Sequence, residues 1–146
     1  MPDEREAEVR QFAEAQHATR LHILTAVTPF RAAQDRFVVL ERDGMAMLVA
    51  CVGCPFRAPL SRGEPQPLAQ AKVDQFLAAL APLAVETLDD HFPEGAHDGT
   101  TLVFERLDGR GYVQVAMLNP PPRSQHAQII AAWTRTFPAV RAALGR

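Results

Sequence analysis

Two Asp-Gly dipeptides, Asp43-Gly44 and Asp108-Gly109, each separate a pair of apolar runs of strand length. The runs are Phe37–Arg42 and Met45–Val52 around the first dipeptide, and Thr100–Leu107 and Gly111–Leu118 around the second. Asp-Gly between apolar runs is a strong local signal of a β-hairpin, because a type I′ turn needs positive φ at both central residues. The sequence therefore predicts two antiparallel hairpins.

The other patterned segments predict one more strand and three helices. Leu21–Val27 places apolar and β-branched residues at every second position, which favours a strand. Apolar residues at helical spacing predict three helices: Asp3 to about Arg20; one that starts at Pro67 and ends or kinks at Pro82; and one capped by Ser124 and kinked at Pro138.

The elements follow the order α-β-β-β-α-β-β-α, and antiparallel hairpins with one apolar face need helices to cover it. We therefore expect an α+β fold in two layers, with an antiparallel sheet of two hairpins plus one strand covered by three helices. The length of 146 residues suits a single domain over residues 1–146. The element order resembles that of small bacterial secretion chaperones and similar effector-binding proteins, although a fold does not decide a function.

The apolar members of the periodic segments are expected to form the core. They are Phe37, Val39, Met47, Val49, Phe76, Leu80, Val103, Val113, Val115, Trp133 and Phe137.

Composition and charge argue against nucleic acid and membrane as partners. The chain has 15 basic and 17 acidic residues, a net charge of −2, and therefore no basic excess for nucleic acid. The longest apolar run, Met45–Val52, is far shorter than the ~20 residues that span a bilayer. The charged N-terminus lacks the apolar stretch of a signal peptide. Lys72 is the single lysine among many arginines, alanines and prolines, which favours a GC-rich bacterial gene. The missing membrane span and signal peptide favour a cytoplasmic protein.

Cys51 and Cys54 form the most conspicuous local motif. Two thiols at this spacing can share a metal or cycle through a disulfide. A thioredoxin-like site needs a helix directly after the pair, whereas Pro55, Pro59 and a long loop follow here. Cysteine also packs as a small hydrophobe. We expect both thiols to be structural, reduced and metal-free, with a metal- or thiol-dependent role as the alternative.

Patterns of catalytic residues are lacking. Ser61 and Ser124 are the only serines, and neither lies in a G-x-S-x-G elbow. Lys72 follows no glycine-rich phosphate loop. The stretch Asp89-Asp90-His91 with His97-Asp98 is interpreted as a hydrated loop rather than a metal site. We therefore expect no catalytic residues, metal ligands or cofactors.

Two long loops, 53–66 and 86–99, offer a surface to a protein partner. Aromatic side chains in loops are typical anchors, and clustered carboxylates steer association. The candidate partner-binding residues are Phe56, Asp89, Asp90, Phe92 and Glu94. We expect a protein-binding module without catalytic activity, of the chaperone, immunity or inhibitor type, whose partner is another protein. A homo-oligomer is equally compatible with the sequence.

Overall fold

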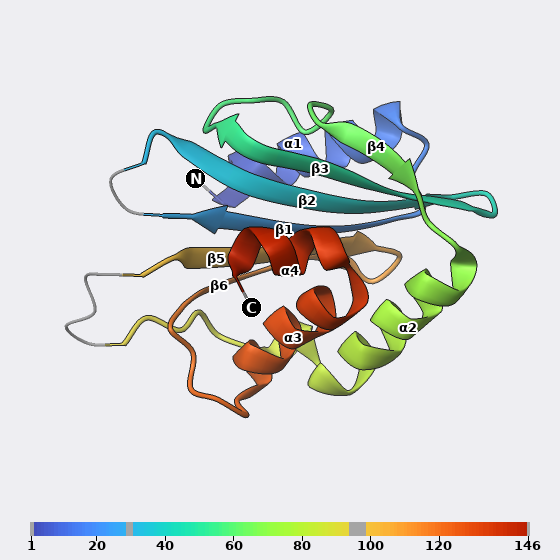
Figure 1. The fold of residues 1–146 in the computed structure, drawn as a ribbon. Helices are drawn as coiled ribbons and strands as arrows, with labels where there is room; N and C mark the ends of the chain where they lie inside the picture. The colour runs from blue at the N-terminus through green and yellow to red at the C-terminus, as the bar shows by residue number, and fades with distance from the viewer. Residues whose placement is uncertain (1, 29–30, 94–98, 146) are drawn as a thin grey trace.

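A computed structural model describes residues 2–28, 31–93 and 99–145. Six antiparallel strands form one open sheet in the order β4-β3-β2-β1-β5-β6 (Figure 1). The strands are β1 Arg20–Val27, β2 Ala33–Arg42, β3 Met45–Pro55, β4 Glu64–Pro67, β5 Thr101–Asp108 and β6 Gly111–Leu118. The helices are α1 Pro2–Ala15, α2 Gln70–Leu80, α3 Gln125–Thr136 and α4 Pro138–Leu144, with short 3₁₀ helices η1 Ala81–Leu83 and η2 Val85–Thr87.

Both expected hairpins are confirmed. In the first, Asp43 and Gly44 take φ values of 31° and 72°, as a primed turn requires. In the second, β5 ends at Asp108 and β6 begins at Gly111, so the turn lies one residue later than expected. The reason is an Asx contact, in which the N–H of Arg110 donates to Asp108 Oδ1 at 2.8 Å.

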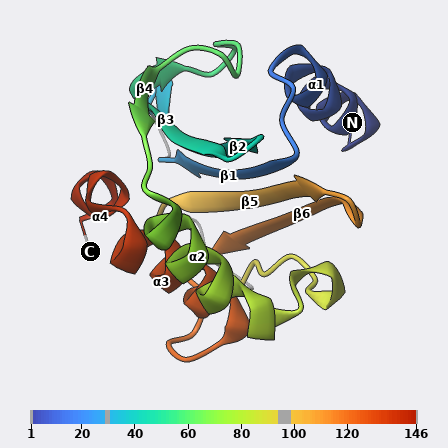
Figure 2. The same cartoon turned by 90° about the vertical axis from the view of Figure 1, so that its right-hand side faces the viewer.

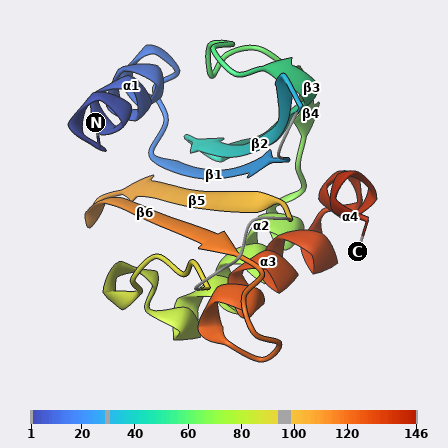
Figure 3. The same ribbon diagram turned by 90° about the vertical axis from the view of Figure 1, so that its left-hand side faces the viewer.

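Helices cover both faces of the sheet, with α1 on one side and α2, α3 and α4 on the other (Figures 2 and 3). The α+β class and the antiparallel sheet are confirmed, whereas the two-layer arrangement and the count of three helices are wrong. The physical reason lies in β1 and β2, where Leu21–Leu24 and Phe37–Leu40 are buried at consecutive positions on both faces. A strand that is apolar on both faces needs cover on both.

The larger core lies under α2, α3 and α4 and is centred on Trp133, which is fully buried. Its indole lies 4.8 Å from the ring of Phe76 and 5.8 Å from that of Phe137, between ring centroids. Three expected core residues are only partly buried: Met47, Val103 and Val113. Met47 and Val103 face the side that α1 covers only in part, and Val113 lies on the edge strand β6.

Proline positions account for the other differences. Pro67 ends the extra strand β4 instead of starting α2, which begins at Gln70. Pro138 does more than kink the last helix, because it starts a separate helix, α4. The Ser124 cap is confirmed, since its side chain accepts the N–H of Ala127 at 3.1 Å. Within the described ranges, no helix is both long and apolar enough to cross a membrane.

Candidate functional site

A groove lies between α1 and β4 on the α1 face of the sheet. The sheet curls at β3 and β4, so that these strands and the loop between them stand opposite α1 (Figures 2 and 3). The cavity has a volume of about 270 Å³. We call it the α1 groove; its lining residues are Phe12, Gln16, Leu40, Arg42, Met47, Val49, Ser61 and Pro65.

The floor of the α1 groove is apolar sheet that α1 leaves open. The second core lies beneath α1, where Val9 and Ala13 are buried against β1. Phe12 and Met47 pack against the same core but remain partly exposed. The groove is therefore continuous with the core and keeps apolar side chains accessible.

The α1 wall is held by an ion pair between the partly exposed Arg5 and the buried Glu105. Arg5 donates from Nε and Nη2 to the two carboxylate oxygens of Glu105, each at 2.8 Å, and the hydroxyl of Tyr112 donates to Glu105 Oε2 at 2.6 Å. Burial opposes the charge on Arg5, but its hydrogen bonds to Glu105 prevail and raise the pKa of Arg5. At the other end of α1, Arg42 donates from Nη1 to the carbonyl of Gln16 at 2.7 Å.

The opposite wall is the loop between β3 and β4, which a buried arginine holds in place. Arg36 is 2% exposed and donates to the carbonyls of Ala58 at 3.0 Å, Pro59 at 2.7 Å and Arg62 at 3.3 Å. Burial lowers the pKa of Arg36, since the charge is taken out of water. Three carbonyls on one guanidinium give this loop a defined shape.

Cys51 and Cys54 form a disulfide at the base of that loop, so the expectation of two reduced thiols is wrong in this structure. Side chains three residues apart normally point to opposite faces of a strand. Here Gly53 takes a φ of +67°, and its N–H donates to Asp35 Oδ1 at 2.9 Å. This local reversal brings the two Cα atoms to 5.6 Å, within the range that a disulfide bridges.

Ligands for a metal are not gathered in the part of the chain that the structure describes, where no group of three or more His, Cys, Asp or Glu residues could hold an ion. His97 and Asp98, which belong to the stretch interpreted as a hydrated loop, lie outside the described residues.

Residues 89–92, which we call the acidic segment, lie along the outer edge of β6, where His91 takes part in sheet pairing. The N–H of His91 donates to the carbonyl of Ala116, and the N–H of Leu118 donates to the carbonyl of His91, both at 2.9 Å. Asp90 Oδ1 accepts the N–H of Ala116 at 2.9 Å, and the ring of His126 contacts the carbonyl of Asp89 at 2.6 Å. Asp90 therefore caps a sheet edge, a role that no sequence pattern indicated.

The structure separates the candidate partner-binding residues. Phe92, 54% exposed, lies beside β6, and Phe56, 49% exposed, follows β3 near the other edge. Four strand spacings of roughly 4.8 Å each lie between β6 and β3. Glu94 lies outside the described residues. These side chains do not form one continuous surface.

Proline blocks one route of protein association at β4. Gln66 lies opposite Leu48 and Glu64 opposite Ala50, and the N–H of Leu68 donates to the carbonyl of Ala46 at 2.9 Å. The backbone nitrogens of Pro65 and Pro67 therefore point away from β3. Proline has no N–H to donate to an added strand. The outer side of β4 is therefore a poor template for an added strand.

Comparison with known proteins gives no relative from which a function could be transferred. No family model matches the chain, and no curated protein is significantly similar to it.

Sequence reasoning did not identify the α1 groove. Phe12 belongs to the narrow apolar stripe of the first predicted helix, and Met47 was expected to be buried. One signal in the sequence could have indicated this groove. The strands β2 and β3 carry more apolar residues than the narrow apolar stripe of a single helix can cover.

Proposed function

We propose that this protein is a protein-binding module without catalytic activity, and that its α1 groove receives an apolar side chain of a partner polypeptide. The observation that carries this proposal is the partly exposed apolar floor at Phe12 and Met47. One wall beside it is held by the partly buried Arg5 and the other by the buried Arg36. Binding energy in protein interfaces concentrates where an anchor fills such a preformed pocket. Fixed walls reduce the entropy lost when a partner binds.

The size of the α1 groove favours a side chain over a larger ligand. Its volume of about 270 Å³ is below the roughly 300–1,000 Å³ of typical small-molecule sites. Arg42 is the one charged side chain among the described residues that line it. The partner segment is therefore proposed to carry an apolar residue with a carboxylate nearby, because opposite charges give orientation and specificity.

The test is peptide selection followed by matched substitutions on β3. Short random peptides displayed on phage are selected on the wild-type protein, and binding is compared between Met47→Asp and Val52→Asp. Both changes put a carboxylate on β3, but Val52 is 66% exposed and lies outside the groove. We expect Met47→Asp to abolish binding and Val52→Asp to leave it unchanged.

A second variant tests the proposal independently in case Met47→Asp does not fold. Gln16→Trp fills the groove from α1 without removing a core side chain, and we expect it to block the same peptides. Equal loss in Val52→Asp, or full binding in Gln16→Trp, would contradict the proposal. A wild-type dimer that Gln16→Trp converts to a monomer would make a second copy of the chain the occupant.

The acidic segment is proposed as a separate steering region for a basic part of the partner. Asp89 and Asp90 are exposed at the β6 edge beside Phe92. Neutralising Asp89, Asp90 and Glu94 together should slow association at low salt and have less effect at high salt. An unchanged on-rate at low salt would show that this segment only binds water.

The alternative function is thiol-dependent, and the Cys51–Cys54 disulfide favours it over a metal-dependent one. In this case the disulfide accepts two electrons and two protons from a dithiol donor and becomes two thiols. We propose the bacterial cytoplasm as the location, where thiols are kept reduced. Trapping thiols in intact cells tests the location, because a fully oxidised pair would contradict the cytoplasm.

A further inference from the structure

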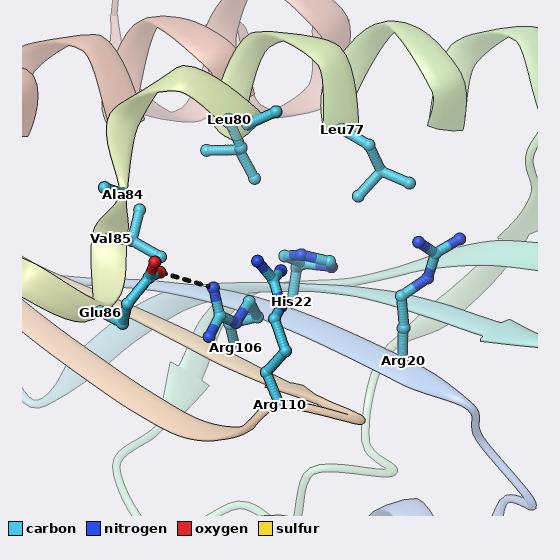
Figure 4. Close-up of a pocket in the computed structure, with 10 residues that line it drawn as sticks. Arg20, His22, Leu77, Leu80, Ala84, Val85, Glu86, Arg106 and Arg110 are labelled. Atoms are coloured by element: carbon cyan, nitrogen blue, oxygen red, sulfur yellow. Dashed lines mark hydrogen bonds and ion pairs between the residues drawn. The ribbon is translucent and has the colours of Figure 1, made fainter.

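A second cavity, of about 250 Å³, lies on the other face of the sheet, beneath α2 (Figure 4). We call it the α2 pocket. Its roof is apolar and is formed by Leu77 and Leu80 of α2 and Val85 of η2. Its floor is basic and comes from the strands below. The two surfaces together suit a ligand with an apolar body and a charged end.

The basic floor is built by register in the sheet. His22 on β1 lies directly opposite Arg106 on β5 in the antiparallel pairing, so their side chains share the α2 face. Arg20 reaches the same face from β1, and Arg110 reaches it from the turn before β6 (Figure 4). Three guanidinium groups and one imidazole therefore line one small cavity.

Two buried polar atoms in this floor lack hydrogen bonds. His22 is 2% exposed and Arg106 is 4% exposed, yet His22 Nδ1 and Arg106 Nε have no hydrogen-bond partner in the described structure. Buried polar groups are nearly always satisfied, because an unmade hydrogen bond is costly. Arg106 Nε faces Asp108 Oδ2 at 3.4 Å, so His22 Nδ1 is the polar atom of this floor that a bound ligand would satisfy.

Three carboxylates pair with the three arginines of the pocket, but only one of the carboxylates lines the cavity. Glu41 pairs with Arg20 at 2.6 Å, and Asp108 pairs with Arg110 at 2.8 Å and with Arg106 at 3.4 Å. Neither carboxylate is among the residues that line the cavity. Glu86 does line it and pairs with Arg106 at 3.2 Å, but the Glu86 side chain is 48% exposed.

This arrangement gives a reason for anion binding. A ligand that displaces the half-exposed Glu86 leaves Arg106 facing a new acceptor. Arginine forms bidentate, charge-assisted hydrogen bonds with carboxylate and phosphate groups, and these are among the strongest in proteins. The carboxylate of Glu86 occupies the position beside Arg106 that the charged group of a ligand would take.

We propose that the α2 pocket binds a small organic anion, whose carboxylate or phosphate contacts Arg106 and Arg110 and whose short apolar body lies under Leu77 and Leu80. The site is on the opposite face of the sheet from the α1 groove and does not depend on the function proposed for that groove. The volume restricts the ligand to a body of a few carbon atoms.

The test uses butyrate and propyl phosphate as probes, with butyramide as the uncharged control. Amide chemical shifts of ¹⁵N-labelled full-length protein are followed during titration. We expect saturable shifts around His22 and Arg106 with at least one anion and none with butyramide. The better of the two anions identifies the charged group as carboxylate or phosphate.

Matched variants separate a built site from general attraction between charges. Arg110→Gln removes a guanidinium whose side chain is 68% exposed, so the core stays intact. Arg10→Gln is the control, because Arg10 is 52% exposed and pairs with Glu6 on α1. We expect Arg110→Gln to weaken anion binding about tenfold and Arg10→Gln to leave it unchanged.

Three results would overturn the proposal. They are an absence of saturable shifts with both anions, equal binding of butyramide, and equal loss of affinity in Arg110→Gln and Arg10→Gln. Glu86→Gln gives an independent reading, since removal of the competing carboxylate should tighten anion binding. Weaker binding in Glu86→Gln would also contradict the proposal.

Discussion

The guanidinium of Arg5 and the carboxylate of Glu105 meet in two hydrogen bonds of 2.8 Å, although the residues lie 100 positions apart in the chain. Glu105 is 1% exposed, so its charge is shielded from water and depends on Arg5 and Tyr112 for compensation. This contact joins α1 to the central part of the sheet. It therefore sets the position of one wall of the α1 groove.

Glu105→Gln should destabilise the protein by about 2 kcal/mol, because it leaves the partly buried Arg5 without its counter-charge. The free energy of unfolding in urea measures the effect. Glu8→Gln is the matched control, since Glu8 also pairs with Arg5, at 3.3 Å, but is 50% exposed. That change should cost less than about 0.5 kcal/mol. Equal losses in the two variants would contradict the role of Glu105.

Tyr112 should resist ionisation in the folded protein. Burial and then the hydrogen bond to Glu105 raise its pKa above the ordinary value of about 10. The unfolded chain ionises first, so the stability from Tyr112 is complete below about pH 10 and is lost as the pH rises beyond it. Tyr112 is the single tyrosine, so tyrosinate absorbance reports on it alone. The signal should follow unfolding, and absorbance that rises near pH 10 in folded protein would refute this.

His22 should make the protein sensitive to mild acid. Burial and then the charge of Arg20 lower its pKa to about 3. Below about pH 6.5 the unfolded chain binds a proton that folded His22 does not, so this stability is complete above pH 6.5 and is lost as the pH falls. Urea unfolding should show a loss of up to about 1.4 kcal/mol per pH unit.

His22→Gln should reduce this acid-dependent loss of stability. His17→Asn, at an exposed residue with a φ of 54°, should leave it unchanged, because asparagine tolerates this backbone conformation. The same pH dependence in wild type and His22→Gln would show that other groups cause it.

The Cys51–Cys54 disulfide should stabilise the protein by about 2 kcal/mol, the modest value expected for so short a closed loop. Purified protein, unfolded without reductant, should show no free thiol by Ellman's reagent. Dithiothreitol should lower the unfolding midpoint of wild type but not that of the Cys51→Ala, Cys54→Ala double variant. Two thiols per chain in freshly purified, air-exposed protein would argue against the disulfide.

Trp133→Ala should cost about 3–5 kcal/mol, because the indole is fully enclosed among aromatic rings. The denaturant midpoint, followed by far-ultraviolet circular dichroism, measures this loss. Phe92→Ala is the control, since that ring is 54% exposed. A midpoint that Trp133→Ala leaves unchanged would remove Trp133 from the core.

Local signals explain why much of the fold could be predicted. Asp43-Gly44 specifies a turn through its own backbone conformation, and Ser124 caps α3 through the N–H three residues on. Pro138 interrupts a helix because its ring excludes the preceding helical hydrogen bond. The extra strand β4 was missed because two of its four residues are prolines, which have no N–H and argue against a strand.

The sequence by itself determined the two hairpins, the Ser124 cap and the α+β class, because turns, caps and periodic burial depend on neighbouring residues. Only the tertiary structure decided that β1 lies between β2 and β5, which places His22 opposite Arg106. It also decided that Arg5 reaches Glu105. No local pattern encodes which distant strand becomes a neighbour. That choice follows from burying both apolar faces of β1 and β2 at once and from pairing the charges that this burial removes from water.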